Sequence, residues 1–221
     1  MRSLYILTLA LLTVTACKKS ATLSLPSASL LVANGVVGGG TLTLNPTVQT
    51  VGNNAWNIFP LLPGDGNIDL SNKAVTPAVS YYKGTIKVAD LDNYSLFLGG
   101  ASPAQVDAVL IKESYQNYND SVCGVRFINL SPNSNPISVN LAGSANGSEV
   151  SSLAYRSYSD FKQYPATKAN ASYIFEIRDA GTGNKITSYS LPTPYFHNVT
   201  LMLGGLVGGT PAVGIIPVQH P

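Results

Sequence analysis

The sequence predicts an all-β protein made of two similar antiparallel β-sandwich domains in tandem. Three observations lead to this prediction. Short segments that alternate apolar and polar residues recur along the chain, clusters of Gly, Pro, Asn and Asp separate them, and the whole arrangement occurs twice. Beyond residue 16, no stretch keeps an apolar stripe at helical spacing for three turns.

The N-terminal residues have the features of a secretory signal. Arg2 supplies a positive charge, residues 4–15 form an apolar run too short to span a bilayer, and small residues precede Cys17. Residues 14–17, Val-Thr-Ala-Cys, resemble the lipobox of bacterial lipoproteins, in which the cysteine becomes the first residue and carries acyl chains. This resemblance implies a lipoprotein signal peptide over residues 1–16, lipidation of Cys17 and a lipidated tether over residues 17–28. The alternative is an ordinary signal with an incidental cysteine.

An anchor of this kind would make the membrane a partner of the protein. Each buried methylene contributes about 0.8 kcal/mol, so several acyl chains hold a protein durably. We therefore expect a lipid-anchored protein of the bacterial outer membrane, and the sequence leaves open whether its body faces the periplasm or the cell surface.

The composition of the chain argues against a nucleic-acid partner and against a disulfide. Charged residues make up 11% of the chain, the formal net charge is +2, and no basic cluster is present, so we expect no nucleic-acid partner. Cys17 and Cys123 are the only cysteines, and acylation of Cys17 would leave no intramolecular disulfide. Stability must then come from packing, and Cys123 is predicted to be a small buried residue at the start of a strand.

The internal repeat supports the tandem organisation. Residues 93–100 read NYSLFLGG and residues 198–205 read NVTLMLGG, and at the same separation Phe59-Pro60 matches Tyr164-Pro165. Nearer the start of each copy, Asn34 matches Asn129 at a slightly smaller separation, because the second copy has a loop insertion near residues 142–152. Three matching blocks in one order indicate a duplication, with domains at 29–117 and 118–221.

Each copy is predicted to contain six or seven short strands, as in an immunoglobulin-like β-sandwich. In residues 172–178, for example, Tyr173, Phe175 and Ile177 share one face. The Gly-Gly pairs that end the repeated octets are predicted to need a positive φ or a close backbone approach. Among the predicted strands are residues 41–45, 81–88, 94–100 and 107–111 in the first copy, and 137–141, 172–178, 185–191, 199–205 and 213–218 in the second.

Several of these segments resemble a known family. Asn-x-Ser-Pro at 129–132, the aromatic-Pro turn at Tyr164, YIFEIRD and VTLMLGG together resemble the domain of unknown function 4397 family. Residues 124–218 match best, whereas residues 29–113 match more loosely because the first copy lacks the Ser-Pro. The resemblance implies bacterial extracytoplasmic β-sandwich domains, often in tandem and often in lipoproteins, with adhesion, scaffolding or ligand binding as their role.

No residue pattern points to catalysis, a metal or a cofactor. His197 and His220 are the only histidines; we expect the first on the surface and the second in a frayed terminus. With one free cysteine they form no zinc set. The acidic residues, such as Glu113 and Glu149, show no paired arrangement, and most of them are expected in solvent, at strand edges or in loops. The chain also has no nucleophile elbow and no phosphate-binding loop, so we expect no enzyme.

Asp65, Asn67 and Asp69 have the spacing of the first ligands of a calcium loop. The sixth position is Leu70 where such loops have Gly, and the twelfth is Thr76 where they have Glu. A hairpin at Pro-Gly-Asp-Gly, residues 63–66, is the favoured interpretation, and cation binding is the alternative.

Tyrosines near the domain boundary are the candidate ligand contacts. Exposed tyrosines offer flat amphipathic surface to sugars or protein partners, and the favoured alternative is that they cover the sandwich ends or the domain junction. These tyrosines are Tyr115, Tyr118, Tyr155 and Tyr158. Residues 120–122, Asp-Ser-Val, resemble a short bacterial O-glycosylation signal, which makes Ser121 a candidate for modification.

We expect a non-catalytic cell-envelope role in interaction, adhesion or scaffolding, with a glycan or an envelope protein as the candidate partner. One alternative is a carbohydrate-binding module of a polysaccharide-uptake system. A further alternative is a pilus or surface-layer subunit in which chains exchange an edge strand.

Overall fold

The structure, a computed structural model, describes residues 28–116, 118, 121–192 and 197–221. The predicted signal peptide, the lipidation site Cys17 and the tether before residue 28 lie outside the described residues. Within the described part of the chain, regular structure is β apart from the 3₁₀ turn η1 (Lys168–Asn170), and no helix there is long and apolar enough to cross a membrane.

The first domain consists of eight strands in two sheets, ordered β4-β1-β7-β8 and β3-β2-β5-β6. Its core lies between them and is centred on Phe59, Leu70 and Leu96. The strands are β1 (Ala28–Asn34), β2 (Leu42–Leu44), β3 (Thr50–Val51), β4 (Ala55–Leu61), β5 (Gly64–Asn72), β6 (Val79–Val88), β7 (Asn93–Ser102) and β8 (Gln105–Glu113).

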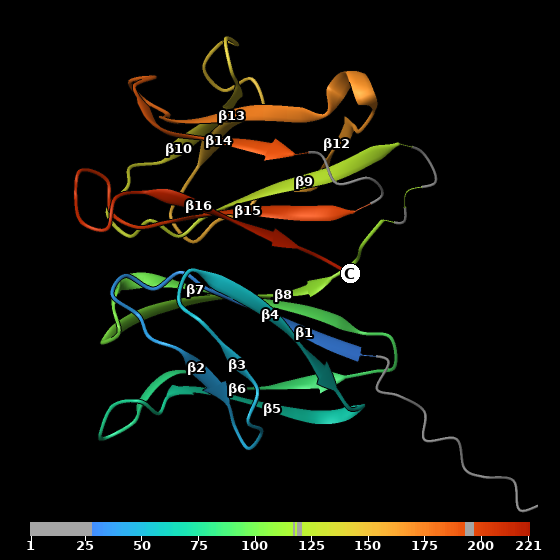
Figure 1. The fold of residues 1–221 in the computed structure, drawn as a ribbon, viewed down its shortest axis with the longest axis vertical. Coiled ribbons are helices and arrows are strands. Elements are labelled where there is room, and N and C mark those ends of the chain that lie inside the picture. The colour runs from blue at the N-terminus through green and yellow to red at the C-terminus, as the bar shows by residue number, and fades with distance from the viewer. Residues whose placement is uncertain (1–27, 117, 119–120, 193–196) are drawn as a thin grey trace, which may run out of the picture.

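The second domain repeats this arrangement strand for strand, with sheets ordered β12-β9-β15-β16 and β11-β10-β13-β14 (Figure 1). Tyr173, Phe175 and Ile177 share the core face of β13, as the alternation predicts. The prediction of an all-β chain with two tandem immunoglobulin-like β-sandwiches is confirmed. The strands are β9 (Val122–Asn129), β10 (Ile137–Leu141), β11 (Val150–Leu153), β12 (Lys162–Pro165), β13 (Ser172–Asp179), β14 (Lys185–Pro192), β15 (Asn198–Gly204) and β16 (Gly214–Gln219).

The matched asparagines explain why the repeat was detectable. Asn34 and Asn129 are both fully buried at the ends of β1 and β9. In each copy the side-chain oxygen accepts a hydrogen bond from the amide two residues later, and the side-chain nitrogen donates to a carbonyl near the next strands, at Gly52 and Leu153. A buried amide that satisfies several backbone groups cannot be replaced by an apolar residue without leaving them unpaired.

The Gly-Gly pairs also have the predicted role. Gly100 and Gly205 adopt positive φ values of 121° and 84°. A Cβ atom at either position would overlap a backbone carbonyl oxygen, of Gln105 in the first copy and Ala212 in the second. Both copies therefore keep glycine where the backbone of another segment comes too close for a side chain.

Three details differ from the sequence-based expectation. Each domain contains one parallel pair, β1 with β7 and β9 with β15, because these strands are distant in the chain and no hairpin dictates their direction. Each domain has eight strands where six or seven were predicted, because strands as short as β3, with two residues, and β12, with four, do not show a periodicity. The hairpin predicted at residues 63–66 is wrong: β4 and β5 belong to different sheets, and Gly64, Asp65 and Gly66 already lie in β5.

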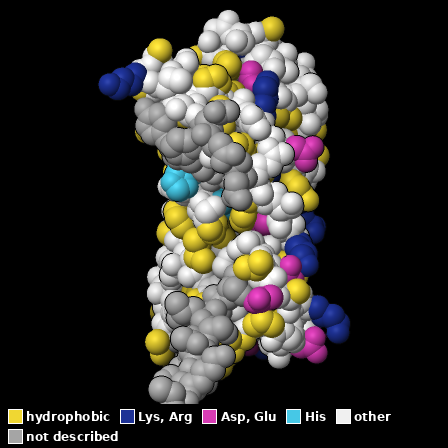
Figure 2. All heavy atoms as spheres, turned by 90° about the vertical axis from the view of Figure 1, so that its right-hand side faces the viewer, with side chains coloured by type: hydrophobic (Ala, Val, Ile, Leu, Met, Phe, Trp, Pro, Cys, Tyr) yellow, Lys and Arg dark blue, Asp and Glu magenta, His cyan; other side chains and the backbone are white. Residues whose placement is uncertain are grey.

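The two sandwiches stack face to face, so that four sheets lie one above another (Figure 1). β8 ends at Glu113 and β9 begins at Val122, and the predicted boundary between residues 117 and 118 falls in this connection. On the face that Figure 2 shows, hydrophobic side chains gather at the level where the domains meet, while basic and acidic side chains lie interspersed.

Candidate functional site

The junction between the domains is a third hydrophobic core. The sheet β4-β1-β7-β8 faces the sheet β12-β9-β15-β16, so equivalent sheets of the two copies meet. Burial of this apolar surface stabilises the assembly and holds the domains in one orientation. The buried residues of this cluster are Leu31, Ala33, Phe97 and Ile111 from the first domain and Ile128, Leu130, Met202, Ile216 and Val218 from the second.

A buried ion pair crosses this junction. The Arg126 guanidinium donates to both Glu113 carboxylate oxygens at 3.0 and 2.6 Å, and its Nε donates to Thr200 Oγ1 at 3.0 Å. The Arg126 and Glu113 side chains are only 4% and 2% exposed. The expectation that Glu113 lies in solvent is therefore wrong, because the facing sheet brings a guanidinium to it.

Aromatic rings from both domains surround the arginine. Its guanidinium carbon lies 5.7 Å from the Phe97 ring centroid, 5.5 Å from that of Tyr158 and 4.4 Å from that of Phe161. These distances allow cation–π attraction, which strengthens as water is excluded. The signal in the sequence was a single charged residue inside the apolar strand β9, and sequence reasoning missed it.

His220 completes this buried network, and its predicted fraying is wrong. Its backbone amide donates a hydrogen bond to the Asn198 carbonyl, which extends the pairing of β15 with β16. Its ring nitrogens form hydrogen bonds with Tyr115 Oη at 2.9 Å and with Thr200 Oγ1 at 2.7 Å. The residue is 2% exposed. Burial, with the charge of Arg126 added, lowers the pKa of His220 to about 3, so the ring is neutral at physiological pH.

All four candidate tyrosines lie at or beside the junction. Tyr115 contacts His220, Tyr118 donates to Asn198 Oδ1 at 2.9 Å, and Tyr155 donates to Asp107 Oδ2 at 2.7 Å. Tyr158 stacks over Arg126 and is 45% exposed. The favoured alternative, in which these tyrosines cover the sandwich ends or the domain junction, predicts this placement. Three of the four hydroxyl groups already have hydrogen-bond partners in the protein.

The candidate cation ligands lie on an open strand face. Asp65, Asn67 and Asp69 share one face of β5, and their register partners on β6 are Lys87, Thr85 and Lys83. Both aspartates form ion pairs with the lysines at 3.6 Å, and Thr85 Oγ1 donates to Asn67 at 3.0 Å. The two lysines on β6 thus lie next to the aspartates, where a calcium ion would need further carboxylate ligands. Among the described residues, no group of three His, Cys, Asp or Glu side chains could hold a metal.

The remaining candidates are single positions. Ser121 is exposed just before β9, so its side chain is accessible. Cys123 is buried in β9 as predicted, and burial raises the pKa of its thiol to about 11. His197 is exposed as predicted. Glu149, expected in solvent, is 6% exposed and accepts from Lys162 Nζ at 2.7 Å and Tyr164 Oη at 2.6 Å, because the two sheet edges of the second domain approach each other there.

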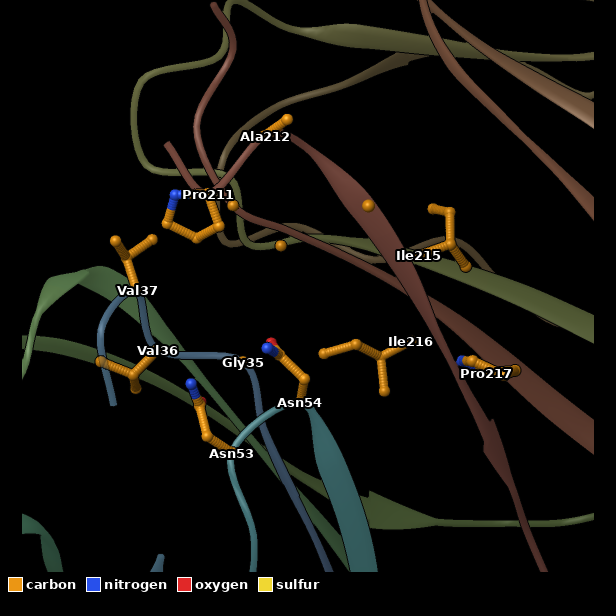
Figure 3. Close-up of a pocket in the computed structure, with 13 residues that line it drawn as sticks. Gly35, Val36, Val37, Asn53, Asn54, Pro211, Ala212, Ile215, Ile216 and Pro217 are labelled. Atoms are coloured by element: carbon orange, nitrogen blue, oxygen red, sulfur yellow. The ribbon is translucent and has the colours of Figure 1, made fainter. Parts of the chain in front are cut away.

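An interdomain pocket of about 230 Å³ opens at one side of the junction (Figure 3). Residues 35–37 and 53–54 of the first domain and residues 204–205, 211–212 and 214–217 of the second line it. In Figure 3 the amide groups of Asn53 and Asn54 lie on one side of the cavity, opposite Val37 and Pro211. None of the lining side chains is ionisable, and the buried Oδ1 of Asn53 has no hydrogen-bond partner. Sequence reasoning missed this pocket, since its walls come from both copies.

Comparison with known proteins adds little on function. No protein-family model and no curated protein matches the chain. Among solved structures, the chain is similar to family 41 carbohydrate-binding modules from streptococcal virulence factors, described in connection with alpha-glucan recognition. The identity is 13%, the TM-score is 0.28, and the match covers 80% of this chain and 94% of that chain. At this TM-score the match says nothing about a ligand of the present chain.

Proposed function

We propose that the protein is a bacterial lipoprotein, anchored to the outer membrane through Cys17, whose body has a non-catalytic role in envelope interaction, adhesion or scaffolding. The observation that carries the proposal is the face-to-face junction. The ion pair between Arg126 and Glu113 and the apolar cluster around it join two domains into one body. Such a body presents its surfaces at a set distance and angle from the anchor, which suits a scaffold or a receptor.

The resemblance of residues 124–218 to the domain of unknown function 4397 family is part of this proposal. It adds the expectation of an extracytoplasmic location, which agrees with the signal-like N-terminus. The body is kept in water while the lipid holds its first residue, and a short polar segment, residues 18–27, connects the two.

The test begins with the anchor. The full chain is expressed in a bacterium that processes lipoproteins, and the intact mass of the membrane-extracted product is measured. The expected mass is that of the chain from Cys17 onward plus acyl groups, and a Cys17→Ser variant should be recovered without lipid. A wild-type chain that is cleaved elsewhere, or that remains soluble, would contradict the anchor.

The second part of the test concerns chemistry and exposure. Purified protein should hydrolyse no member of a panel of glycans and esters, and turnover that a single substitution abolishes would contradict the non-catalytic role. Protease treatment of intact cells then distinguishes a surface-exposed body, which is degraded, from a periplasmic one, which survives until the outer membrane is opened.

A carbohydrate-binding function is the second candidate, and the interdomain pocket favours it. The pocket combines side-chain amides with an uncharged wall. Trp56, the only tryptophan of the chain, does not line it but follows the lining residue Asn54 by two positions, on β4. Amides that donate and accept, next to an aromatic face, are suited to the hydroxyl groups and the apolar face of a sugar.

A further inference from the structure

The two domains meet with an approximate twofold relation. Gly99 approaches Leu130 closely, and at the equivalent place in the other half Gly204 approaches Gly35. Gly99 and Gly204 are equivalent by the repeat, and so are Gly35 and Leu130. The junction therefore has two equivalent notches, one beside β8 and one beside β16.

The notch beside β8 is filled by charged and aromatic side chains. Tyr155 Oη donates to Asp107 Oδ2 at 2.7 Å, and Arg156 Nη1 lies 3.3 Å from Asp107 Oδ1. The two residues come from the second domain and the carboxylate from the first. This interdomain cluster closes the notch.

The notch beside β16 is the interdomain pocket, and the equivalent residues there are small and uncharged. Asp107 pairs with Gly99 and Gly214 pairs with Gly204, so Gly214 stands where the first copy has the carboxylate. Asn54 stands where the second copy has Arg156: both have a positive φ, of 54° and 63°.

Backbone hydrogen bonds support this equivalence. The Asn54 amide donates to the Asn34 carbonyl at 2.7 Å, and the Arg156 amide donates to the Asn129 carbonyl at 2.8 Å. Asn53 is thereby equivalent to Tyr155. Three positions thus differ between the closed and the open notch. The connection between β15 and β16 is also longer than that between β7 and β8, and Pro211 and Ala212 of this connection line the open notch.

Trp56 in the first domain occupies a position that corresponds to that of Tyr158 in the second. Trp56 lies directly opposite Ala33 in the antiparallel pair of β1 and β4, and Tyr158 forms a bridge with Ile128. Opposed residues share a face of the sheet, and both Ala33 and Ile128 belong to the junction cluster, so both aromatic side chains lie on the junction face. Trp56 is 36% exposed.

The cation beneath Tyr158 has no equivalent on this side. The residue equivalent to Arg126 is Leu31, which is buried and apolar. The first domain therefore has no cation at the position that corresponds to Arg126, and part of the Trp56 surface is in solvent.

From this asymmetry we infer that the interdomain pocket binds a neutral sugar ring of a glycan, with Trp56 as the stacking surface and Asn53 and Asn54 as hydrogen-bond partners. The absence of ionisable lining side chains selects against charged ligands. The side-chain amides of Asn53 and Asn54, which both line the pocket, can donate to and accept from the hydroxyl groups of a sugar. A volume of about 230 Å³ lies below the roughly 300–1,000 Å³ of sites for drug-sized molecules and suits one small ring.

This inference is independent of the lipid anchor and of the scaffolding role, so its failure would leave both intact. It deepens only the carbohydrate-binding candidate, to which it assigns a site and a ligand class. None of the four candidate tyrosines lines this pocket, so the inferred site differs from the ligand contacts that the sequence suggested.

The experiment uses the single tryptophan as the reporter. The protein is screened on an array of neutral glucans, mannans, galactans and xylans together with sulfated and uronic-acid glycans, and the best neutral oligosaccharide is then titrated while Trp56 fluorescence is recorded. We expect saturable binding and a change in emission. Trp56→Ala, tested by array or calorimetry, should weaken binding at least about tenfold, whereas the matched variant Tyr158→Ala should leave it unchanged.

A second variant closes the pocket with residues that the protein already uses. Asn53→Tyr, Asn54→Arg and Gly214→Asp together copy the filled notch, and a Cβ atom at Gly214 meets no heavy atom within 4 Å. The variant should fold with an unchanged thermal midpoint and lose the binding. Three results would each overturn the inference: no neutral glycan bound by the wild type, binding restricted to charged glycans, or full affinity retained in the folded closed-notch variant.

Discussion

Removing one partner of the buried ion pair should be far more harmful than removing both. The Arg126 side chain is 4% exposed, and in Glu113→Ala the only hydrogen bond left to its guanidinium would be the one to Thr200 Oγ1, at 3.0 Å in the wild type. Two charge-assisted hydrogen bonds are lost, each worth about 1.5–3 kcal/mol. Uncompensated buried charges typically cost about 3–5 kcal/mol, and we expect a loss in this range for the free energy of unfolding.

The double variant Arg126→Leu/Glu113→Leu is the matched control. A buried pair can often be replaced by apolar residues at no cost, because the desolvation penalty disappears together with the attraction. The structure offers a precedent within the same chain, since the residue equivalent to Arg126 in the first domain is the buried Leu31. We expect the double variant to lie within about 1 kcal/mol of the wild type.

Urea unfolding, followed by far-ultraviolet circular dichroism and by Trp56 fluorescence, measures the effect. With a slope of about 2 kcal/mol per molar urea, a loss of about 4 kcal/mol lowers the midpoint by roughly 2 M. Circular dichroism reports on both domains and Trp56 on the first, so weakening of the junction should also separate the two transitions. A Glu113→Ala loss below about 1 kcal/mol, or a double variant as unstable as the single one, would refute the reasoning.

Three further predictions concern other buried groups. Because the folded pKa of His220, about 3, lies below its unfolded value of 6.5, the unfolded chain binds the extra proton, and stability should fall as pH drops from 6.5 toward 3. Thermal midpoints measured between about pH 6.5 and 5, above the range in which carboxyl groups titrate, should lose most of that dependence in His220→Gln and keep it in His197→Gln. Equal behaviour of the two variants would contradict the assignment. Asn129→Ala and Asn34→Ala should each cost about 1–3 kcal/mol in urea unfolding, since buried backbone groups lose their partners, and a change within about 0.5 kcal/mol would argue against their shared role. The Cys123 thiol, with its pKa raised to about 11, should react with a maleimide only as the protein unfolds, and rapid labelling of native protein would show that β9 is more open than described.

The sequence predicted the elements whose causes are local. Alternation placed Tyr173, Phe175 and Ile177 on the core face of β13, and the repeated Gly-Gly pairs indicated a backbone that only glycine adopts at Gly100 and Gly205. The duplication was visible because each copy must satisfy the same fold. These features depend on neighbouring residues or on one domain at a time, and periodicity is enough to reveal them.

The tertiary structure alone decided how the copies meet and what the junction does. Contacts between distant segments pair Arg126 with Glu113 and bury His220 near the end of the chain. They also place β4, which ends at Leu61, and β5, which begins at Gly64, in different sheets. The open notch is of the same kind. No sequence pattern singles out Asn53, Asn54 or Gly214. They line one pocket only because the two domains pack against each other there. Side-chain alternation specifies the face on which a residue lies, but the partner of that face is set by the packing of whole sheets.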